Sequence, residues 1–334
     1  MNKKVLTEMN KITSKNRLYS IWRNYKLEIG MILVLITIFV IMQIITGYAL
    51  KQRNILNVFQ AAAPYMIMAM GQLLIVITGG IDLSVGSIFS LAGMIGTLAL
   101  QRGGIAAGML TALAVGLVCG TINGILVSKV KMAPFIVTLA MQGAASSLTY
   151  ILAGGNSQTI TESAFKEFDR GSLFLGIPNY ILYMVLLGVI MHLILKYTVF
   201  GRSIYATGSN EEAAKLVGVP TVRIKMFSYI ICGVFCGLAA MLNASYLMTV
   251  ECSACTGMEL TVIAATVIGG ASLSGGVGTA VGAFIGAVMI ATINNSINLM
   301  GINSFWSGTV TGVVIIVAVL IGTSAAKKRA KKTN

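Results

Sequence analysis

Long apolar stretches recur along this chain, and they lack the alternation of polar and apolar residues that a transmembrane β-strand requires. A helix needs about 20 mostly apolar residues to cross a bilayer. We find ten such stretches, each apolar on most of its faces, as a helix in lipid must be. They lie at approximately 28–50, 62–80, 83–101, 104–128, 133–153, 179–198, 226–250, 258–274, 277–298 and 304–323. The pattern predicts an all-α polytopic membrane protein.

The composition favours one membrane domain without a soluble appendage. Of the 334 residues, 56% are hydrophobic and 10% are charged, whereas a soluble domain carries about 25% charged residues. We assign 1–27 to a basic N-terminal segment, 28–323 to the membrane domain and 324–334 to a basic tail. The first apolar run is too long for the core of a signal peptide, so we expect it to remain as a span.

The net charge of +14 reflects topology. Lysine and arginine gather before the first span, after the last span, near residue 130 and around 199–225. The positive-inside rule places these segments and both termini in the cytoplasm, which requires an even number of spans. Ten spans satisfy it, and the charge therefore does not indicate a nucleic-acid partner.

A polar segment, 199–225, interrupts the apolar pattern in the middle of the chain. It holds two of the ten acidic residues, as adjacent glutamates. Asn210 is a favourable N-cap, the glutamates suit the positive end of a helix, and Gly218 is a stop signal. Lys215 follows Glu211 by four residues, the favourable order for an ion pair. We predict a short cytoplasmic helix over 210–218 that has a binding partner.

Two glycine-rich clusters, 78–86 and 268–276, align without gaps at an offset of 190 residues. The match predicts an internal duplication, parallel or inverted, as many transporters have. Each glycine pair should end one helix, and Asp82 or Ser272 can cap the next helix. Helices broken at membrane depth need protein or a water-filled cavity around the freed backbone groups. Asp82 is therefore either a cap or a residue of a solute pathway.

Glycines at four-residue spacing predict close helix packing, in the sets Gly116, Gly120, Gly124 and Gly278, Gly282, Gly286. Polar residues within the spans either hydrogen-bond a hydroxyl-rich solute or hold helices together. The candidates for a translocation path are Asp82, Ser84, Asn123, Glu259, Ser272, Ser274, Asn294 and Asn295.

Several functional classes are disfavoured by what the sequence lacks. The chain has no Gly-Lys pair and hence no P-loop. It has no Ser-His-Asp, Cys-His or metal-ligand set, and Cys252 and Cys255 lack a second pair or a nearby histidine. It also lacks the series of intramembrane carboxylates and histidines typical of proton coupling. We expect neither an enzyme nor a bound metal or cofactor, and any energy for transport must come from another subunit.

Four passages resemble one family, in its order and spacing. They are Gly79-Gly-Ile-Asp-Leu-Ser-Val-Gly-Ser87, Asn123-Gly124 with Pro134-Phe-Ile-Val-Thr-Leu139, Gly201-Arg202 with Ala206-Thr-Gly-Ser-Asn-Glu-Glu-Ala-Ala214 and Gly218, and Glu259-Leu260 with Ile268-Gly-Gly-Ala-Ser-Leu-Ser-Gly-Gly276. The chain resembles the permease subunits of ATP-binding-cassette importers for ribose and related monosaccharides.

The resemblance implies a multi-pass protein of the bacterial cytoplasmic membrane with three kinds of protein partner. These are a cytoplasmic ATP-binding-cassette ATPase, an extracytoplasmic sugar-binding protein, and a second permease protomer in a homodimer or close heterodimer. It also implies that the 210–218 helix is the family's coupling helix, which sits in a groove of the ATPase. The residues assigned to coupling are Arg202, Gly208, Asn210, Glu211, Glu212, Ala213, Ala214 and Gly218.

Departures from the family pattern leave the solute open. Ser146-Ser147 replaces a common Arg-Gly pair, and Thr261 replaces an acid after Glu259-Leu260. The alternatives to ribose are another pentose, a hexose, a furanose derivative, a nucleoside or a sugar-like signal molecule. A rival outside the class is an ATP-independent secondary transporter, and a membrane enzyme or scaffold is a further alternative.

Overall fold

The computed structural model describes residues 26–174, 176–253, 257–303, 305–317 and 320. Most of the basic segments predicted at the two termini lies outside these residues, as does Cys255.

Helices account for nearly all of the described structure. Seven are long and apolar enough to cross a membrane: α2 Lys26–Thr46, α3 Gln52–Ile77, α4 Val85–Ser128, α5 Pro134–Ala153, α7 Asn179–Tyr197, α10 Thr221–Leu247 and α12 Ala280–Leu299. Shorter apolar helices are α11 Met258–Ile268 and a segment at Trp306–Val317. The helix α4 is bent at Gly104, where φ is 80°, and its two arms match two predicted spans. The ten predicted stretches are each represented by a helix, which confirms the all-α polytopic fold.

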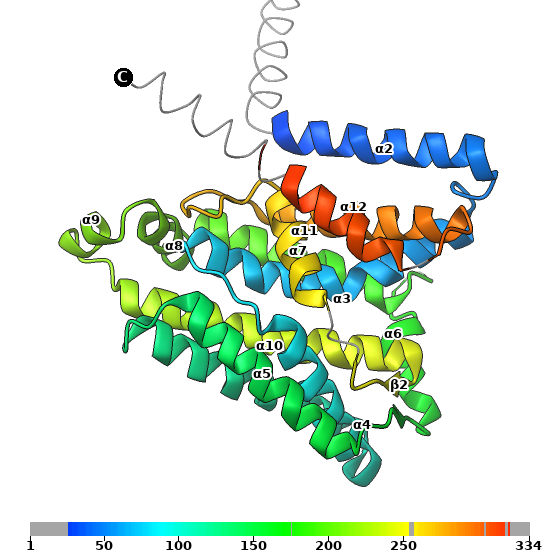
Figure 1. Cartoon of the computed structure of the whole chain (residues 1–334), viewed down its shortest axis with the longest axis horizontal. Coiled ribbons are helices and arrows are strands. Elements are labelled where there is room, and N and C mark those ends of the chain that lie inside the picture. The colour runs from blue at the N-terminus through cyan, green and yellow to red at the C-terminus, as the bar shows by residue number, and fades with distance from the viewer. Residues whose placement is uncertain (1–25, 175, 254–256, 304, 318–319, 321–334) are drawn as a thin grey trace, which may run out of the picture.

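Polar ends carry the remaining elements. The helices α8 Val199–Ser209 and α9 Glu211–Leu216 lie at one end of the bundle (left in Figure 1). The short helix α6 Lys166–Arg170, the 3₁₀ turn η1 Ser163–Phe165 and a two-stranded antiparallel pair lie at the other end. That pair joins β1 Gln158–Thr159 to β2 Thr249–Val250, with Gln158 opposite Val250. The long helices therefore run between two polar ends, as a membrane-spanning bundle requires.

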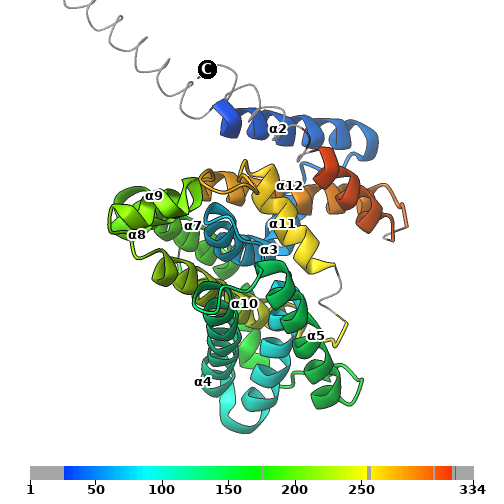
Figure 2. The same cartoon turned by 60° about the vertical axis from the view of Figure 1, so that its left-hand side comes forward.

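The helix α3 is the centre of the bundle. In its most apolar window 83% of the residues are buried inside the chain, against 11% for α2. Figures 1 and 2 show α3 between α12 and α10, with α4 and α5 beyond α10 and α2 at the outer edge beside α12. Because α2 exposes apolar side chains such as Leu33, Ile44 and Ile45, it is suited to a lipid environment rather than to water.

Glycine permits the closest helix contacts. A Cβ at Gly116 would lie 2.0 Å from the carbonyl oxygen of Gly233, and one at Gly120 would lie 2.5 Å from that of Tyr229, so α4 and α10 pack backbone to backbone. A Cβ at Gly286 would lie 2.0 Å from the carbonyl oxygen of Ala265. The two predicted glycine ridges are thus confirmed as packing positions, and their physical reason is close approach of helices.

Candidate functional site

The predicted 210–218 helix is present and capped at both ends. Asn210 Oδ1 accepts a hydrogen bond of 2.9 Å from the Ala213 amide. At the other end Gly218 has φ of 84°, its amide donates to the Lys215 carbonyl, and the Val219 amide donates to the Ala214 carbonyl, each at 3.0 Å. This is a Schellman motif, in which the left-handed residue favours glycine. The stop signal predicted from the sequence therefore acts through its backbone conformation.

The two glutamates of α9 have different environments. Glu211 is turned toward α10, where it pairs with Lys225, and its Oε1 lies 3.2 Å from Lys215 Nζ, as the four-residue spacing predicted. Partial burial raises the pKa of Glu211, but the hydrogen bonds and charges of Lys225 and Lys215 outweigh it and lower that pKa below its usual value. Glu211 thus fastens α9 to the base of α10.

The outer surface of α9 is exposed. Glu212 has 82% of its side chain exposed, and it pairs only with Lys215, at 2.7 Å, among the described residues. Leu216 and Val217 are 89% and 79% exposed. We did not single out these two residues from the sequence, although two apolar residues directly before a helix-stopping glycine were a usable signal. An apolar tip beside a charge is the composition of a small protein-docking surface.

The helix α8 connects α9 to the membrane domain through backbone contacts. A Cβ at Gly208 would lie 1.7 Å from the carbonyl oxygen of Ile77, the last residue of α3. Tyr205 donates a hydrogen bond of 2.7 Å to the carbonyl of Gly278, just before α12. Arg202 is exposed and its guanidinium donates to the Tyr197 carbonyl at 3.4 Å, so it lies away from the α9 tip. Gly208 is thus the contact position, and α8 touches the ends of both α3 and α12.

The two glycine-rich clusters form the same turn at the same end of the bundle. The Gly79 and Gly80 amides donate to the Val76 and Ile75 carbonyls, and the Gly270 and Ala271 amides donate in the same pattern to Val267 and Thr266. The left-handed residues are Gly79 and Gly270, so the turns correspond at an offset of 191 rather than 190. The Gly276 amide donates to the Ile77 carbonyl, so both turns lie at the α8 end and the repeated motif runs parallel, not inverted.

The prediction that Asp82 caps a helix is wrong. The N-cap residue of α4 is Ser84, without a side-chain capping bond. Asp82 Oδ1 instead accepts from the Ser84 amide at 2.8 Å and from Ser84 Oγ at 2.5 Å, and Asn123 donates to Ser84 Oγ at 2.9 Å. These three predicted path residues are all buried. They form one polar cluster that holds the turn between α3 and α4.

The prediction that Ser272 caps the helix after the second cluster is also wrong. The helix α12 begins at Ala280, and its cap is Thr279 Oγ1, which accepts from the Gly282 amide at 3.0 Å. Ser272 Oγ accepts from the Ser274 amide at 3.3 Å within the intervening loop. The loop differs from the first cluster because the second cluster has no helix start directly after its turn.

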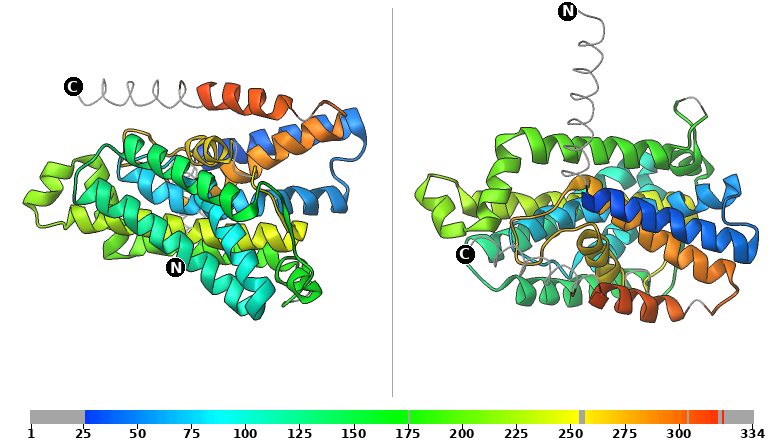
Figure 3. Two further views of the ribbon diagram at one scale, coloured as in Figure 1. Left: turned by 60° about the horizontal axis from the view of Figure 1, so that its bottom comes forward. Right: turned by 90° about the horizontal axis from the view of Figure 1, so that it is seen from above.

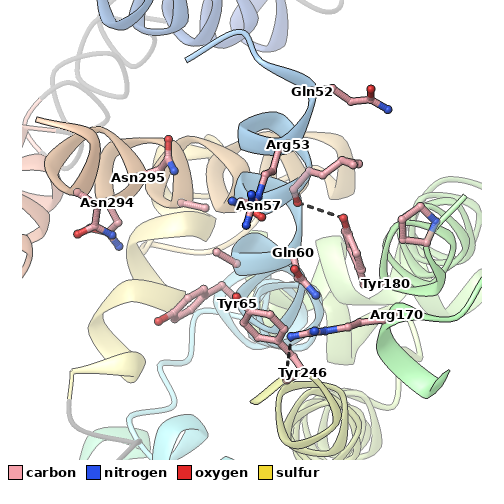
Figure 4. Close-up of a pocket in the computed structure, with 15 residues that line it drawn as sticks. Gln52, Arg53, Asn57, Gln60, Tyr65, Arg170, Tyr180, Tyr246, Asn294 and Asn295 are labelled. Atoms are coloured by element: carbon pink, nitrogen blue, oxygen red, sulfur yellow. Dashed lines mark hydrogen bonds between the residues drawn. The ribbon is translucent and has the colours of Figure 1, made fainter. Parts of the chain in front are cut away.

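A polar cavity of about 950 Å³ lies at the opposite end of the bundle. Asn294 and Asn295 of α12 line it, so two predicted path residues reach the same space. Figure 4 shows these side chains facing α3, which carries Asn57 and Gln60. We missed the α3 residues because the span was predicted from residue 62, whereas α3 begins at Gln52.

The outer edge of the cavity is held by a buried carboxylate. Gln60 Nε2 donates a hydrogen bond of 2.6 Å to Asp169 of α6. Burial raises the pKa of Asp169 to about 6, against the opposing effects of the Gln60 hydrogen bond and the charge of Arg170. The Ser245 hydroxyl accepts from the Asp169 amide at 3.1 Å, which ties α6 to α10.

The predicted path residues therefore fall into separate groups. Asp82, Ser84 and Asn123 form the cluster near the turn of α3, and Ser272 and Ser274 lie in the loop before α12. Asn294 and Asn295 line the cavity. Glu259 lies in the first turn of α11, and its Oε2 is buried without a hydrogen-bond partner among the described residues. Within the described residues no group of three His, Cys, Asp or Glu side chains could hold a metal ion.

Comparison with known proteins identifies the family. Residues 54–319 match the family model described as a branched-chain amino acid transport system permease component. The chain belongs to this permease family. It is 47% identical over 84% of its length to a probable ABC transporter permease of Sinorhizobium fredii, y4mJ, of which it covers 84%. No solved structure matches the chain.

Two further relatives have named solutes. The ribose import permease RbsC of Bacillus subtilis is 41% identical over 88% of this chain and 92% of its own length. The autoinducer 2 import permease LsrC of Yersinia pseudotuberculosis is 35% identical over 85% of this chain and 81% of its own length. This member of the family is a multi-pass membrane transport subunit, as the sequence predicted.

Proposed function

We propose that the chain forms the transmembrane path of an ATP-driven importer for a monosaccharide. An extracytoplasmic binding protein delivers the solute, and a separate cytoplasmic ATPase hydrolyses ATP. The path lies between this chain and a second permease protomer, identical or closely similar. The basic residues around α8 and α9 favour a cytoplasmic position for that end and place the cavity toward the outside.

The observation that carries the proposal is the construction of α9. It is capped at both ends, its exposed tip carries Leu216, Val217 and Glu212, and Glu211 fastens it to α10. A helix of six residues is too short to be stable alone in water. Its caps and its ion pairs keep it formed, so a partner meets a rigid surface at low entropic cost.

The same helix is placed to act on the membrane domain. Movement of α9 is transmitted to α8, which contacts Ile77 through Gly208 and contacts Gly278 through Tyr205. Ile77 ends α3 and Gly278 directly precedes α12. The 26 residues of α3 span about 39 Å, and the opposite ends of α3 and α12 line the polar cavity. We infer that a displacement at α9 tilts these two helices and switches access to the cavity.

The names of the relatives favour a sugar as solute. They include permeases for ribose, for L-arabinose and for autoinducer 2, whereas the family description names branched-chain amino acids. The relatives named for ribose are the more similar to this chain, and monosaccharide import therefore follows from them rather than from the family's description.

An uptake assay tests the proposed function. The chain is purified from native membranes with its bound ATPase, and the complex is reconstituted in proteoliposomes with the binding protein encoded beside it. We expect uptake of radiolabelled D-ribose or another monosaccharide that requires ATP and all components. Counterflow of the same sugar by the chain alone would instead establish a secondary transporter, and ATP-driven uptake of L-leucine without sugar uptake would establish an amino-acid importer.

A further inference from the structure

We propose that the cavity between α3, α10 and α12 is a solute-binding site for an uncharged, ring-sized polyhydroxylated molecule. This inference rests on the proposed function and assigns it a place and a chemistry. The volume of about 950 Å³ lies at the upper end of the range for small-molecule sites. A monosaccharide therefore fits with room for bridging water.

Hydrogen bonds within the protein leave oxygen acceptors available along the cavity. Gln60 Nε2 is bound to Asp169, so the Gln60 carbonyl oxygen is held toward other partners. Asn295 Nδ2 donates to Asn54 Oδ1 at 3.0 Å, which leaves the Asn295 carbonyl oxygen free of that bond. The Tyr180 hydroxyl donates to the Leu56 carbonyl at 3.1 Å and keeps its own oxygen as an acceptor (Figure 4). Acceptors from three helices therefore suit a ligand with several hydroxyl donors.

Other amides in the cavity lack a partner within the protein. Asn57 and Asn298 are exposed to the cavity, and their side chains have no hydrogen bond among the described residues. Asn294 lines the cavity, and its Oδ1 is buried without a partner in the described part of the chain. A half-turn of the Asn294 amide exchanges its oxygen and nitrogen and presents the oxygen to a solute. A buried amide in this state is destabilising unless a ligand or water satisfies it.

The charges in the cavity exclude a cationic ligand. The charged side chains that line it are Arg53 and Arg170, and no carboxylate of the described residues lines it. Arg170 donates to the Tyr246 carbonyl at 3.2 Å and lies over the Tyr246 ring. The nearby Asp169 is occupied by Gln60. The ring of Tyr65 offers an apolar face beside these polar groups, which suits the C–H face of a sugar (Figure 4).

The geometry allows a test with a matched control. Full-length chain in lipid nanodiscs is titrated with D-ribose, L-arabinose, D-xylose and D-galactose, and binding is followed by calorimetry and saturation-transfer NMR. L-leucine and D-ribose 5-phosphate are the comparison probes. Asn295→Leu and Asn294→Leu each remove an amide from the cavity. Thr97→Val is the control, because Thr97 Oγ1 is equally buried and partnerless but lies outside the cavity.

We expect at least one neutral sugar to bind, and each asparagine substitution to weaken it about tenfold, the effect of one lost hydrogen bond. Asn294→Leu should keep or raise the Tm, because its oxygen has no partner in the described chain. Thr97→Val should leave the affinity unchanged. Absence of sugar binding, equal weakening by Thr97→Val, or displacement of the sugar by L-leucine would overturn the assignment. Sugar uptake by the assembled importer with no binding here would refute the site and leave the proposed function standing.

Discussion

The amide of Gly276 donates a hydrogen bond of 2.8 Å to the carbonyl of Ile77, and this bond joins two segments that are almost 200 residues apart in the chain. Ile77 is the last residue of α3, and Gly276 belongs to the loop that leads into α12. Gly208 of α8 packs against the same carbonyl. Three elements therefore meet at one backbone oxygen, at the end of the bundle where α8 and α9 project (Figure 3).

Gly208→Ala should disrupt this junction. The added Cβ would lie 1.7 Å from the Ile77 carbonyl oxygen and 2.7 Å from the Gly276 amide nitrogen. Because both obstacles are backbone atoms, α8 must shift, at a cost of about 1–3 kcal/mol or more. We expect a lower Tm in detergent and loss of sugar uptake. Gly143→Ala is the control, since a Cβ there meets nothing within 4 Å, and equal behaviour of the two variants would contradict the junction.

Glu212→Lys should uncouple the importer without unfolding the chain. Glu212 is largely exposed and its partner is Lys215, so the substitution places two cations together at the proposed docking surface. ATP hydrolysis by the assembled complex should continue while sugar uptake falls at least tenfold. Glu162→Lys, an exposed glutamate at the opposite end, should leave the coupling ratio unchanged. Normal uptake by Glu212→Lys would refute the assigned role of α9.

Leu216→Asp and Val217→Asp should weaken attachment of the ATPase. Both side chains are exposed in this chain, so neither substitution creates a buried charge and the Tm of the isolated chain should not fall. Loss of an apolar anchor from an interface costs about 2 kcal/mol or more, a loss of affinity of about thirtyfold. Co-purification and a titration of ATPase onto nanodisc-embedded chain measure this. An unchanged affinity in both variants would place the interface elsewhere.

Asp169 should make stability depend on pH at the cavity end. Its pKa of about 6 lies above the ordinary value of 3.8, so the folded chain holds the proton more tightly than the unfolded chain. Stability then decreases as pH rises from about 4 to 6 and levels off above that range. The total effect is at most about 3 kcal/mol at 1.36 kcal/mol per pH unit.

Asp169→Asn separates this effect from that of Glu211. The substituted amide still accepts from Gln60, so the decrease in Tm between pH 4 and pH 6 should vanish. Glu211 has a lowered pKa, so its contribution is present at neutral pH and is lost as pH falls, the opposite direction. A decline between pH 4 and pH 6 that persists in Asp169→Asn would show that another group is responsible.

Asp82→Ala and Ser272→Ala should differ in their effect on stability, although the two residues align in the repeated motif. Asp82 is 1% exposed and satisfies two groups of Ser84, so its removal leaves a buried amide without a partner. The expected cost is about 1–3 kcal/mol. Ser272 accepts a longer bond of 3.3 Å in a loop that water reaches, and its loss should cost less than 0.5 kcal/mol or about that. Chemical denaturation in micelles compares them, and equal losses would show that the clusters are equivalent.

Much of the fold follows from local pattern. The apolar stretches predicted the helices because every backbone group in lipid must be bonded within its own segment. Asn210 and Gly218 predicted the ends of α9 because a cap and a left-handed stop act over a few neighbouring residues. The prediction of α3 began ten residues late, because Gln52, Arg53 and Gln60 are polar and were interpreted as a loop. They are tolerated in the helix because they line a cavity.

The sequence by itself determined the helical membrane fold, the capped helix at 210–218 and the membership of the permease family. Tertiary structure alone decided which of the polar residues share a space. It separated Glu211, which fastens α9 to α10, from Glu212, which is exposed, and it placed Asp82 in a buried turn rather than in the cavity with Asn294 and Asn295. The physical reason is that caps and spans arise from neighbours in sequence. The cavity and the Ile77 junction arise from residues far apart in the chain, whose meeting depends on how the helices pack.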